Sequence, residues 1–408
     1  MATGENPKRC KTKLQTWRTR SDHTEQQQQR INVDRISNLP DNTLHDILCF
    51  LDSKSIVRTS VLSKGWRRLV EALPYNLNFN AKSFDDESSF DVHVKEYLSR
   101  RNRSVAPVKS VTFEFGAKSG IQMILFDRAM QYAAADGKLD HLSVVTHENG
   151  KFGDVAASIV AHRHCRSLEA LVLKGFMLDG LDLHELDHLG FWSLTTLELH
   201  SCFVFNSVPF GLKHLKIVDC TWSSSRCLRI QASRLLDLEI KGLLLCKNVG
   251  TMFALNLKSF RLSCSVFDLK KLPHLDFPSL DRATIRLWCD DDDDPCRLDE
   301  RITSWEDVSR EYMKLLRGLH NAKSLDLRFD ELASGESWKD HFVFGEMKLC
   351  PFTRMETVRI EYPQLQEPPI PDHVIRYLFG GSDEFSLEQI EIVLNTKSTR
   401  IIKMRTVQ

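Results

Sequence analysis

The chain has 408 residues, of which 42% are hydrophobic, so it can bury a sizeable core and form more than one domain. Lys and Arg total 55, as do Asp and Glu, and this zero net charge gives no indication of a broad attraction to nucleic acid. No run approaches the roughly 20 apolar residues that a membrane helix needs, and the N-terminus lacks the apolar core of a signal peptide.

Residues 1–30 are polar, with a basic group at residues 8–13 and four glutamines at residues 26–29. They lack periodic apolar residues, so we expect a disordered tail. The basic group is either a nuclear import signal or a solvated part of that tail.

Residues 34–73 predict three short amphipathic helices that are too small to hide their own apolar faces. Pro40 and Asp41 suit the start of the first helix, whereas Ser53 and Ser63 can cap the second and third. The links between the helices are short, so we expect a compact cluster. The apolar stripe of the first helix consists of Leu44, Ile47, Leu48 and Leu51.

The stretch contains Leu39-Pro40, Ile47-Leu48 and the run Val61-Leu62-Ser63-Lys64 before Trp66. With these motifs, the last of them in a plant-like form, it resembles an F-box, the adaptor-binding module of Skp1–cullin–F-box ubiquitin ligases. We assign the F-box to residues 31–76 and expect linker helices over residues 77–104. The resemblance implies that the module binds a Skp1-like adaptor and, through it, a cullin. Each matching position either contacts the adaptor or holds the helices together. The adaptor-contact candidates are Leu39, Pro40, Leu44, Ile47, Leu48, Leu62 and Trp66.

From residue 105 onward, a segment of the form apolar-x-x-apolar-x-apolar occurs eleven times. The clearest copies recur 18 to 26 residues apart, close to the leucine-rich-repeat period of about 20–29. The last two apolar positions alternate with polar ones, as in a strand with one buried face, and stacked strands share a continuous core. The clearest copies are Leu168-Leu171-Leu173, Leu194-Leu197-Leu199, Leu212-Leu215-Ile217, Leu235-Leu238-Ile240 and Leu257-Phe260-Leu262. The weaker copies are Val108-Val111-Phe113, Leu139-Leu142-Val144, Leu280-Ala283-Ile285, Ala322-Leu325-Leu327, Met355-Val358-Ile360 and Leu387-Ile390-Ile392.

These observations predict an α/β chain, with an N-terminal three-helix F-box followed by a leucine-rich-repeat solenoid with parallel strands. We assign irregular repeats to residues 105–394 and a C-terminal tail to residues 395–408. Cys202 and Cys220 occupy the Asn/Cys position of the repeat, where we expect hydrogen bonds to the neighbouring turn. The last repeats show no clear match to the FBD domain that ends many plant relatives, and we expect them to cap the stack.

Three segments interrupt the repeats. The run Asp290–Asp294 is a solvated loop, a docking site for a basic segment or a weak calcium site. Residues 305–319 predict a helix on the convex side, before the strand at Leu325. The proline-rich stretch 363–371 predicts an extended linker, with an SH3-type ligand as the alternative.

The search for catalytic or metal-binding motifs finds no Gly-rich phosphate loop, nucleophile elbow or zincin motif. The cluster His162-Arg163-His164-Cys165 lacks a partner cluster at zinc spacing, and Cys49 lies in an apolar helix where we expect packing. The 11 cysteines lack any Cys-x-x-Cys pair, which favours reduced thiols in the nucleus or cytoplasm. We therefore expect a non-catalytic chain without a metal or cofactor.

The combination of modules resembles plant F-box/leucine-rich-repeat proteins. It implies a substrate-recognition subunit of a ubiquitin ligase, whose repeats bind an unknown protein target while the F-box binds the adaptor. The alternative is an interaction scaffold that does not promote degradation. We expect neither nucleic acid nor a membrane as a partner. The candidate target-binding residues are the solvent-facing strand positions Glu198, His200, Lys216, Glu239 and Arg261.

Overall fold

In the computed structural model, the chain divides into two compact units, residues 1–73 and 74–408. Each is described by itself. The predicted tail, the histidine cluster at 162–165, the acidic run at 290–294 and the proline-rich stretch lie outside the described residues. The structure describes residues 36, 39–71, 76–100, 107–116, 120–135, 139–161, 166–178, 191–204, 211–222, 228–242, 249–289, 305–332, 352, 354–361, 390–396 and 399–404.

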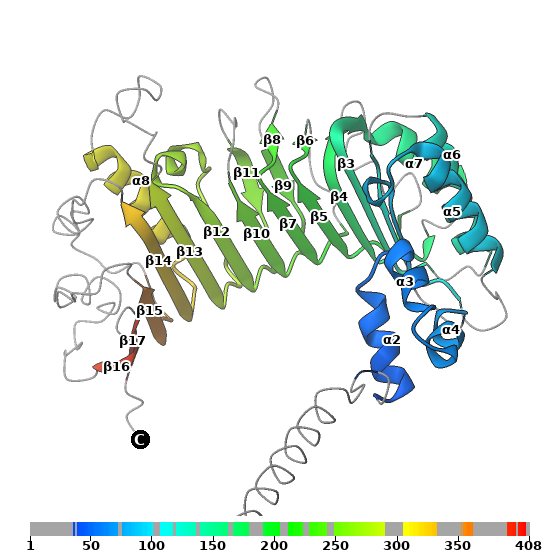
Figure 1. Ribbon diagram of the computed structural model, residues 1–408. Helices are drawn as coiled ribbons and strands as arrows, with labels where there is room; N and C mark the ends of the chain where they lie inside the picture. Colours follow the sequence, from blue (N-terminus) through cyan, green and yellow to red (C-terminus); the bar gives the residue numbers. More distant parts are fainter. Residues whose placement is uncertain are drawn as a thin grey trace, which may run out of the picture. The chain divides into compact units, whose positions relative to one another are not determined.

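The first unit contains the three predicted helices, α2 (Asp41–Cys49), α3 (Ser53–Thr59) and α4 (Lys64–Glu71) (Figure 1). Asp52 caps α3, because its carboxylate accepts a hydrogen bond from the Ser55 backbone N–H at 2.7 Å. The predicted cap Ser53 is instead the first residue of that helix. Before α4, the Ser63 hydroxyl accepts from the Trp66 N–H at 3.2 Å, as predicted. The interior of this unit consists of Leu44, Leu48, Ile56, Trp66 and Leu69.

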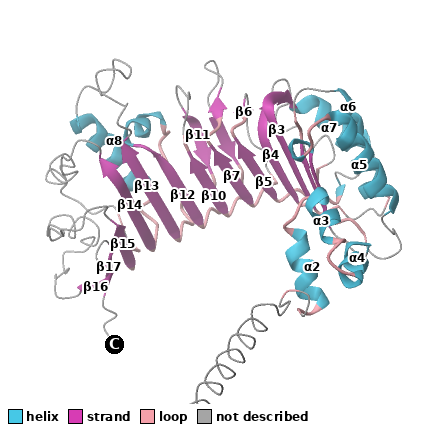
Figure 2. Ribbon diagram, viewed as in Figure 1, coloured by secondary structure: helices cyan, strands magenta, loops and turns pink. Residues whose placement is uncertain are grey.

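The second unit is built on a parallel sheet (Figure 2). The described strands of its parallel part follow the order β1-β2-β3-β4-β5-β7-β10-β12-β13-β14-β15. Their bounds are β1 (Asn76–Asn80), β2 (Ser110–Glu114), β3 (His141–Lys151), β4 (Ala170–Leu178), β5 (Thr196–His200), β7 (His214–Val218), β10 (Asp237–Lys241), β12 (Ser259–Ser265), β13 (Arg282–Cys289), β14 (Ser324–Leu332) and β15 (Thr357–Glu361).

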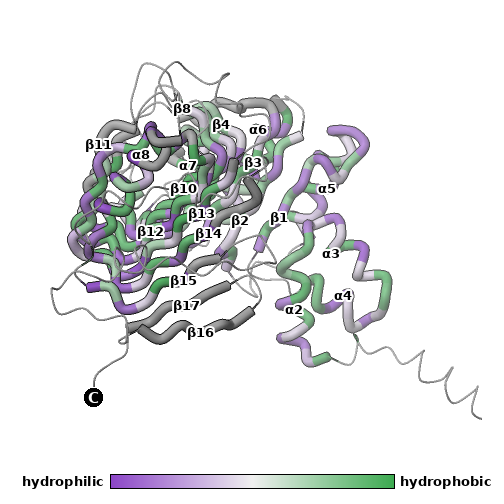
Figure 3. The backbone as a smooth tube through the Cα atoms, turned by 90° about the vertical axis from the view of Figure 1, so that its left-hand side faces the viewer, coloured by the Kyte–Doolittle hydropathy of each residue, from purple (hydrophilic) through white to green (hydrophobic). Residues whose placement is uncertain are grey.

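The strand register confirms the first ten predicted repeats. Leu197 pairs with Leu171 on one side and Leu215 on the other, and the same buried position continues through every parallel strand. Hydrophobic and hydrophilic residues alternate along the strands (Figure 3). Because neighbouring side chains in a strand point to opposite faces, one face of the sheet enters a continuous core and the other faces outward.

The backbone conformation where the chain leaves the central strands also repeats from one strand to the next. Gly175, Ser201, Asp219 and Gly242 each follow the second buried position by two residues, and all four have positive φ. The Ser201 backbone N–H donates to the Val218 carbonyl at 2.8 Å, and the next two strands continue this pattern. Short strand pairs extend the turns beyond these exits. Their bounds are β6 (Phe203–Val204), β8 (Thr221–Trp222), β9 (Leu228–Gln231) and β11 (Val249–Phe253).

Helices lie on the core side of the sheet. At the N-terminal end, α6 contacts β2 and α7 contacts β4, whereas α8 packs on the 3-10 helix η4 near the other end (Figure 2). The predicted helix at 305–319 is confirmed as α8, and its buried residues Tyr312 and Leu316 join the core, as does Leu319 just after the helix. The helix bounds are α5 (Glu87–Arg100), α6 (Gly120–Ala134), α7 (Phe152–Ala161), α8 (Trp305–Gly318), η1 (Ala81–Ser83) and η4 (Val266–Lys271).

The structure departs from the prediction at both ends of the sheet. Residues 77–104 do contain helix α5, but β1 precedes it and pairs parallel with β2, which adds a strand before the first predicted repeat. Buried Phe79 on β1 packs its ring 6.2 Å from that of Phe113 and 5.6 Å from that of Tyr97 on α5. Aromatic burial therefore fixes this segment to the sheet rather than leaving it as a linker.

At the C-terminal end, the eleventh predicted copy is not a further parallel repeat. It falls on β16 (Ile390–Thr396), which pairs antiparallel with β17 (Thr399–Met404). In turn, β17 pairs antiparallel with β15, so the expected tail at 395–408 contains a strand. This hairpin covers the backbone edge of β15, which would otherwise present unpaired N–H and C=O groups.

Candidate functional site

The outer surface of the helical unit is unusually apolar. Phe50 is 87% exposed, Val61 79% and Leu62 65%, although each is a large hydrophobic side chain. Exposed apolar side chains that gather on one small module typically mark an interaction surface. We call this set the apolar helix surface. It consists of Ile36, Leu39, Ile47, Phe50, Val57, Val61 and Leu62.

The structure separates the seven predicted adaptor contacts into two groups. Leu39, Pro40, Ile47 and Leu62 are exposed and available to a partner. By contrast, the interior set Leu44, Leu48 and Trp66 is at most 5% exposed, so these residues hold the helices together in the isolated chain.

Sequence reasoning missed two prominent members of the surface. Phe50 follows the last residue of α2, outside the stripe that periodicity selects. Val61 lies in the link between α3 and α4, where a helical pattern gives no information. Each has a second apolar residue beside it in a short link between helices, Leu51 after Phe50 and Leu62 after Val61, and these apolar pairs were the available signal.

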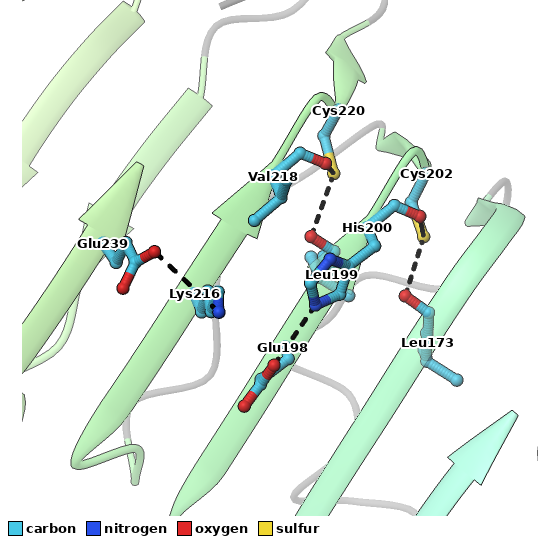
Figure 4. A network of polar contacts seen from close by, with 9 residues as sticks. All are labelled: Leu173, Glu198, Leu199, His200, Cys202, Lys216, Val218, Cys220 and Glu239. Carbon is cyan, nitrogen blue, oxygen red and sulfur yellow. Dashed lines mark hydrogen bonds and ion pairs between the residues drawn. The ribbon is translucent and has the colours of Figure 1, made fainter. Parts of the chain in front are cut away.

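The predicted target-binding residues lie together on the outer face of the sheet. The backbone register places Glu198, Lys216, Glu239 and Arg261 side by side on four adjacent strands. His200 lies two residues beyond Glu198 on the same face. The sheet thus presents a row of alternating charge, as Figure 4 shows in part.

Ion pairs link the residues of this row. The Arg261 Nε lies 3.0 Å from Glu239 Oε2, and the Lys216 Nζ lies 3.8 Å from Glu239 Oε1. A hydrogen bond joins His200 Nε2 and Glu198 Oε2 at 3.2 Å (Figure 4). Partly exposed pairs of this kind contribute little to stability, so the row remains available for exchange with a partner's charges.

Further charged residues continue the row toward the C-terminal end of the sheet. Four arginines occupy outward positions of β13 to β15. They belong to the weaker repeat copies. Arg286 and Arg328 stand at the offset of His200 and Arg359 at that of Glu198, so applying these offsets to the weaker copies would have identified three of the four; Arg282 stands at an offset that the predicted set does not include. These residues are Arg282, Arg286, Arg328 and Arg359.

The cysteines of the repeat turns have structural roles. The Cys202 thiol donates to the Leu173 carbonyl at 3.4 Å, and the Cys220 thiol donates to the Leu199 carbonyl at 3.5 Å (Figure 4). These bonds confirm the predicted ladder. A hydrogen bond with Cys202, together with burial, raises the pKa of the Cys220 thiol far above its usual range. A thiol held protonated in this way is a poor nucleophile.

Other chemistry has little support in the part of the chain that the structure describes. Burial raises the pKa of Cys264, and burial with the nearby Asp46 carboxylate raises that of Cys49. Among the described residues, no three His, Cys, Asp or Glu side chains are placed to hold a metal ion together. A membrane-spanning helix would need a longer apolar stretch than any described helix provides.

Comparison with known proteins identifies the helical unit. Residues 36–78 match the F-box domain family. The chain is 43% identical over 86 residues to an F-box/FBD/LRR-repeat protein of Arabidopsis thaliana, a match that covers 20% of this chain and 18% of the relative. It is 29% identical over 147 residues to F-box/LRR-repeat protein 13 of the same plant, covering 36% of this chain and 32% of the relative.

A further F-box/LRR-repeat protein of Arabidopsis thaliana is 28% identical over 149 residues, covering 36% of this chain and 46% of the relative. These matches each span less than half of the relative's length. Together with the fold, they show an N-terminal F-box followed by a leucine-rich-repeat solenoid, an arrangement similar to the one that the names of these Arabidopsis relatives describe.

Proposed function

We propose that this chain is the substrate-recognition subunit of a Skp1–cullin–F-box ubiquitin ligase. In this role the apolar helix surface binds a Skp1-like adaptor, which links the chain to a cullin. The outer face of the sheet binds a target protein. The chain itself carries out no bond chemistry, and it works by holding a target lysine near a charged E2 enzyme. The proposal includes a nuclear or cytoplasmic location.

The apolar helix surface is the observation that carries this proposal. Seven large hydrophobic side chains are exposed on the described part of the F-box unit, whereas five are exposed on the much larger described part of the sheet unit. Burying one such side chain at an interface contributes roughly 1.5–3 kcal/mol. A few of them at the centre of an interface are sufficient for stable binding.

A matched pair of substitutions tests the adaptor contact. Leu62 is 65% exposed on the F-box unit, and Leu255 is 45% exposed on a turn of the sheet unit. We expect Leu62→Glu to weaken binding of a purified Skp1-like adaptor at least tenfold in isothermal titration calorimetry. Leu255→Glu, the same change at an exposed leucine elsewhere, should leave the affinity within twofold. Equal affinities for the two variants would contradict the proposed contact surface.

Reconstituted ubiquitination separates degradation from scaffolding. A target captured through the sheet face should receive ubiquitin when adaptor, cullin and E2 are supplied, and its modification should disappear with Leu62→Glu. The alternative is an interaction scaffold that does not promote degradation. It would be favoured if a bound target received no ubiquitin in vitro and was degraded at the same rate in cells that lack the chain.

A further inference from the structure

The C-terminal half of the outer sheet face is rich in arginine. We call the set Arg261, Arg282, Arg286, Arg328 and Arg359 the arginine surface. Its members come from β12, β13, β14 and β15, which are adjacent and in register. Each alternates along its strand with buried residues such as Leu262 and Ile285, so all five side chains leave the sheet on the outer face.

The centre of this surface is the pair Arg282 and Arg286 on β13, and both are exposed. In the register, Arg282 lies between Ser259 and Ser324, and Thr284 separates the two arginines along the strand. Short hydroxyl side chains beside long guanidinium groups leave the latter accessible from solvent. The hydroxyls can add hydrogen bonds to an anionic ligand.

Carboxylates within and beside the surface neutralise part of its charge. Asp326, which lies between Thr284 and Arg359 in the register, accepts from Arg328 through both oxygens, at 3.3 Å from Nε and 2.9 Å from Nη2. Glu239 on β10, beside the surface, pairs with Arg261. Across β12 to β15, the outward positions hold five arginines and three carboxylates, which are Asp326, Asp330 and Glu361. A local excess of positive charge therefore lies on a chain whose net charge is zero.

The arrangement of the charges indicates the ligand. The guanidinium groups arise from four strands about 4.8 Å apart, and Arg282 and Arg286 are separated by roughly 13 Å along β13. Among the five arginines, only Arg286 and Arg328 are direct neighbours in the register, so the array as a whole suits several single charges along an extended chain better than one phosphate group, which needs convergent donors. The interspersed carboxylates oppose a nucleic-acid backbone, whose phosphates are continuous.

We propose that the arginine surface binds an acidic segment of the target protein, one rich in Asp and Glu, with Arg282 and Arg286 at its centre. This inference rests on the proposed role of the chain as a substrate receptor and names the chemistry of its target. Arg–carboxylate pairs supply direction as well as attraction, because two parallel N–H···O bonds fix the orientation of the carboxylate.

The test uses the full chain and a fluorescein-labelled peptide of alternating Asp and Gly, with an Asn-Gly peptide as the uncharged control. We expect fluorescence anisotropy to show binding of the Asp peptide alone. The variant Arg282→Gln/Arg286→Gln should weaken that binding at least tenfold. The matched control is Arg100→Gln/Arg128→Gln, which removes the same charge from exposed positions on α5 and α6 and should change binding less than twofold.

Several outcomes would overturn the inference. Equal loss in the two double variants would show unspecific attraction, and equal binding of the Asn peptide would exclude charge recognition. Tighter binding of a single-stranded oligonucleotide would identify nucleic acid as the ligand. If replacing Asp290–Asp294 with asparagines strengthened peptide binding tenfold, the chain's own acidic run would be the occupant. Adaptor binding is measured in parallel, because its loss in Leu62→Glu tests the proposed function separately from the arginine surface.

Discussion

Replacing Gly175 with alanine should destabilise the sheet unit by about 2–4 kcal/mol. Gly175 has φ of 78°, and a Cβ built there would lie 2.0 Å from the Thr146 carbonyl oxygen on the neighbouring strand. An alanine in this left-handed region costs about 1–2 kcal/mol by itself. Because the obstructing atom belongs to the backbone, β3 and β4 must also move apart. The loss of one or two hydrogen bonds adds about 1 kcal/mol each.

The repeat supplies matched controls at equivalent positions. Ser201 occupies the same place on the next repeat with φ of 49°, so its backbone already carries a side chain. We expect Ser201→Ala to stay within about 0.5 kcal/mol of the unchanged protein. Gly242→Ala should be intermediate, because its Cβ would meet the Asp219 carboxylate at 2.5 Å, and a side chain can move away.

Urea unfolding followed by circular dichroism measures all three variants, with the free energy taken from the midpoint and the slope. The expected order of destabilisation is Gly175→Ala, then Gly242→Ala, then Ser201→Ala. A Gly175→Ala free energy within 0.5 kcal/mol of that of Ser201→Ala would refute the close approach of β4 to β3.

Two further predictions concern the core and the pH dependence of stability. Leu197→Ala should lower the free energy of unfolding by about 2–5 kcal/mol in the same assay, because Leu197 is fully buried. Glu198→Ala on the outer face should change it by no more than about 0.5 kcal/mol. Similar values for the two variants would place Leu197 outside the core. Burial lowers the pKa of His141, so the unfolded chain binds a proton more readily than the folded one and the free energy of unfolding should fall as the pH drops below about 6.5. In His141→Gln, the urea midpoint should depend less on pH between about pH 7 and 5. A pH dependence equal to that of the unchanged protein would contradict this.

The fold was largely predictable because two periodicities coincide. Alternation within a strand selects Leu197 and Leu199 for one face, and recurrence of the same pattern about every 23 residues selects a stack. A one-residue slip in such a stack would expose every buried side chain, so the register follows from the apolar positions alone. This is why the pairing of Leu197 with Leu171 and Leu215 agrees with the sequence.

Strand β1 escaped prediction because the repeat signal is incomplete there. Pro74 stands where other copies have an apolar residue before the strand, and asparagines flank Leu77 and Phe79. Asparagine disfavours strands on average, yet two fully buried side chains override that preference. The C-terminal hairpin escaped for a different reason, since alternation predicts a strand but not its direction.

In the F-box, the sequence could not say which apolar residues face inward. Ile47 and Leu48 are adjacent in one helix and belong to the same predicted stripe, but the structure exposes the first and buries the second. A stripe on a short helix is wide enough to serve both the interior and an outer surface. Only the packing of α4 against both α2 and α3 divides it, and that packing is a property of the three helices together.

The two surfaces depend on opposite physical forces, and this difference suits a receptor that holds two partners at once. The apolar helix surface would gain its binding energy from burial, which salt does not screen. The arginine surface would act through exposed charges, whose attraction falls once ionic strength shortens the Debye length to about 8 Å. If the proposed function holds, target exchange would be fast and sensitive to conditions while attachment to the ligase would stay constant. Because the chain places these surfaces in separate compact units, a substitution in one leaves the packing of the other intact.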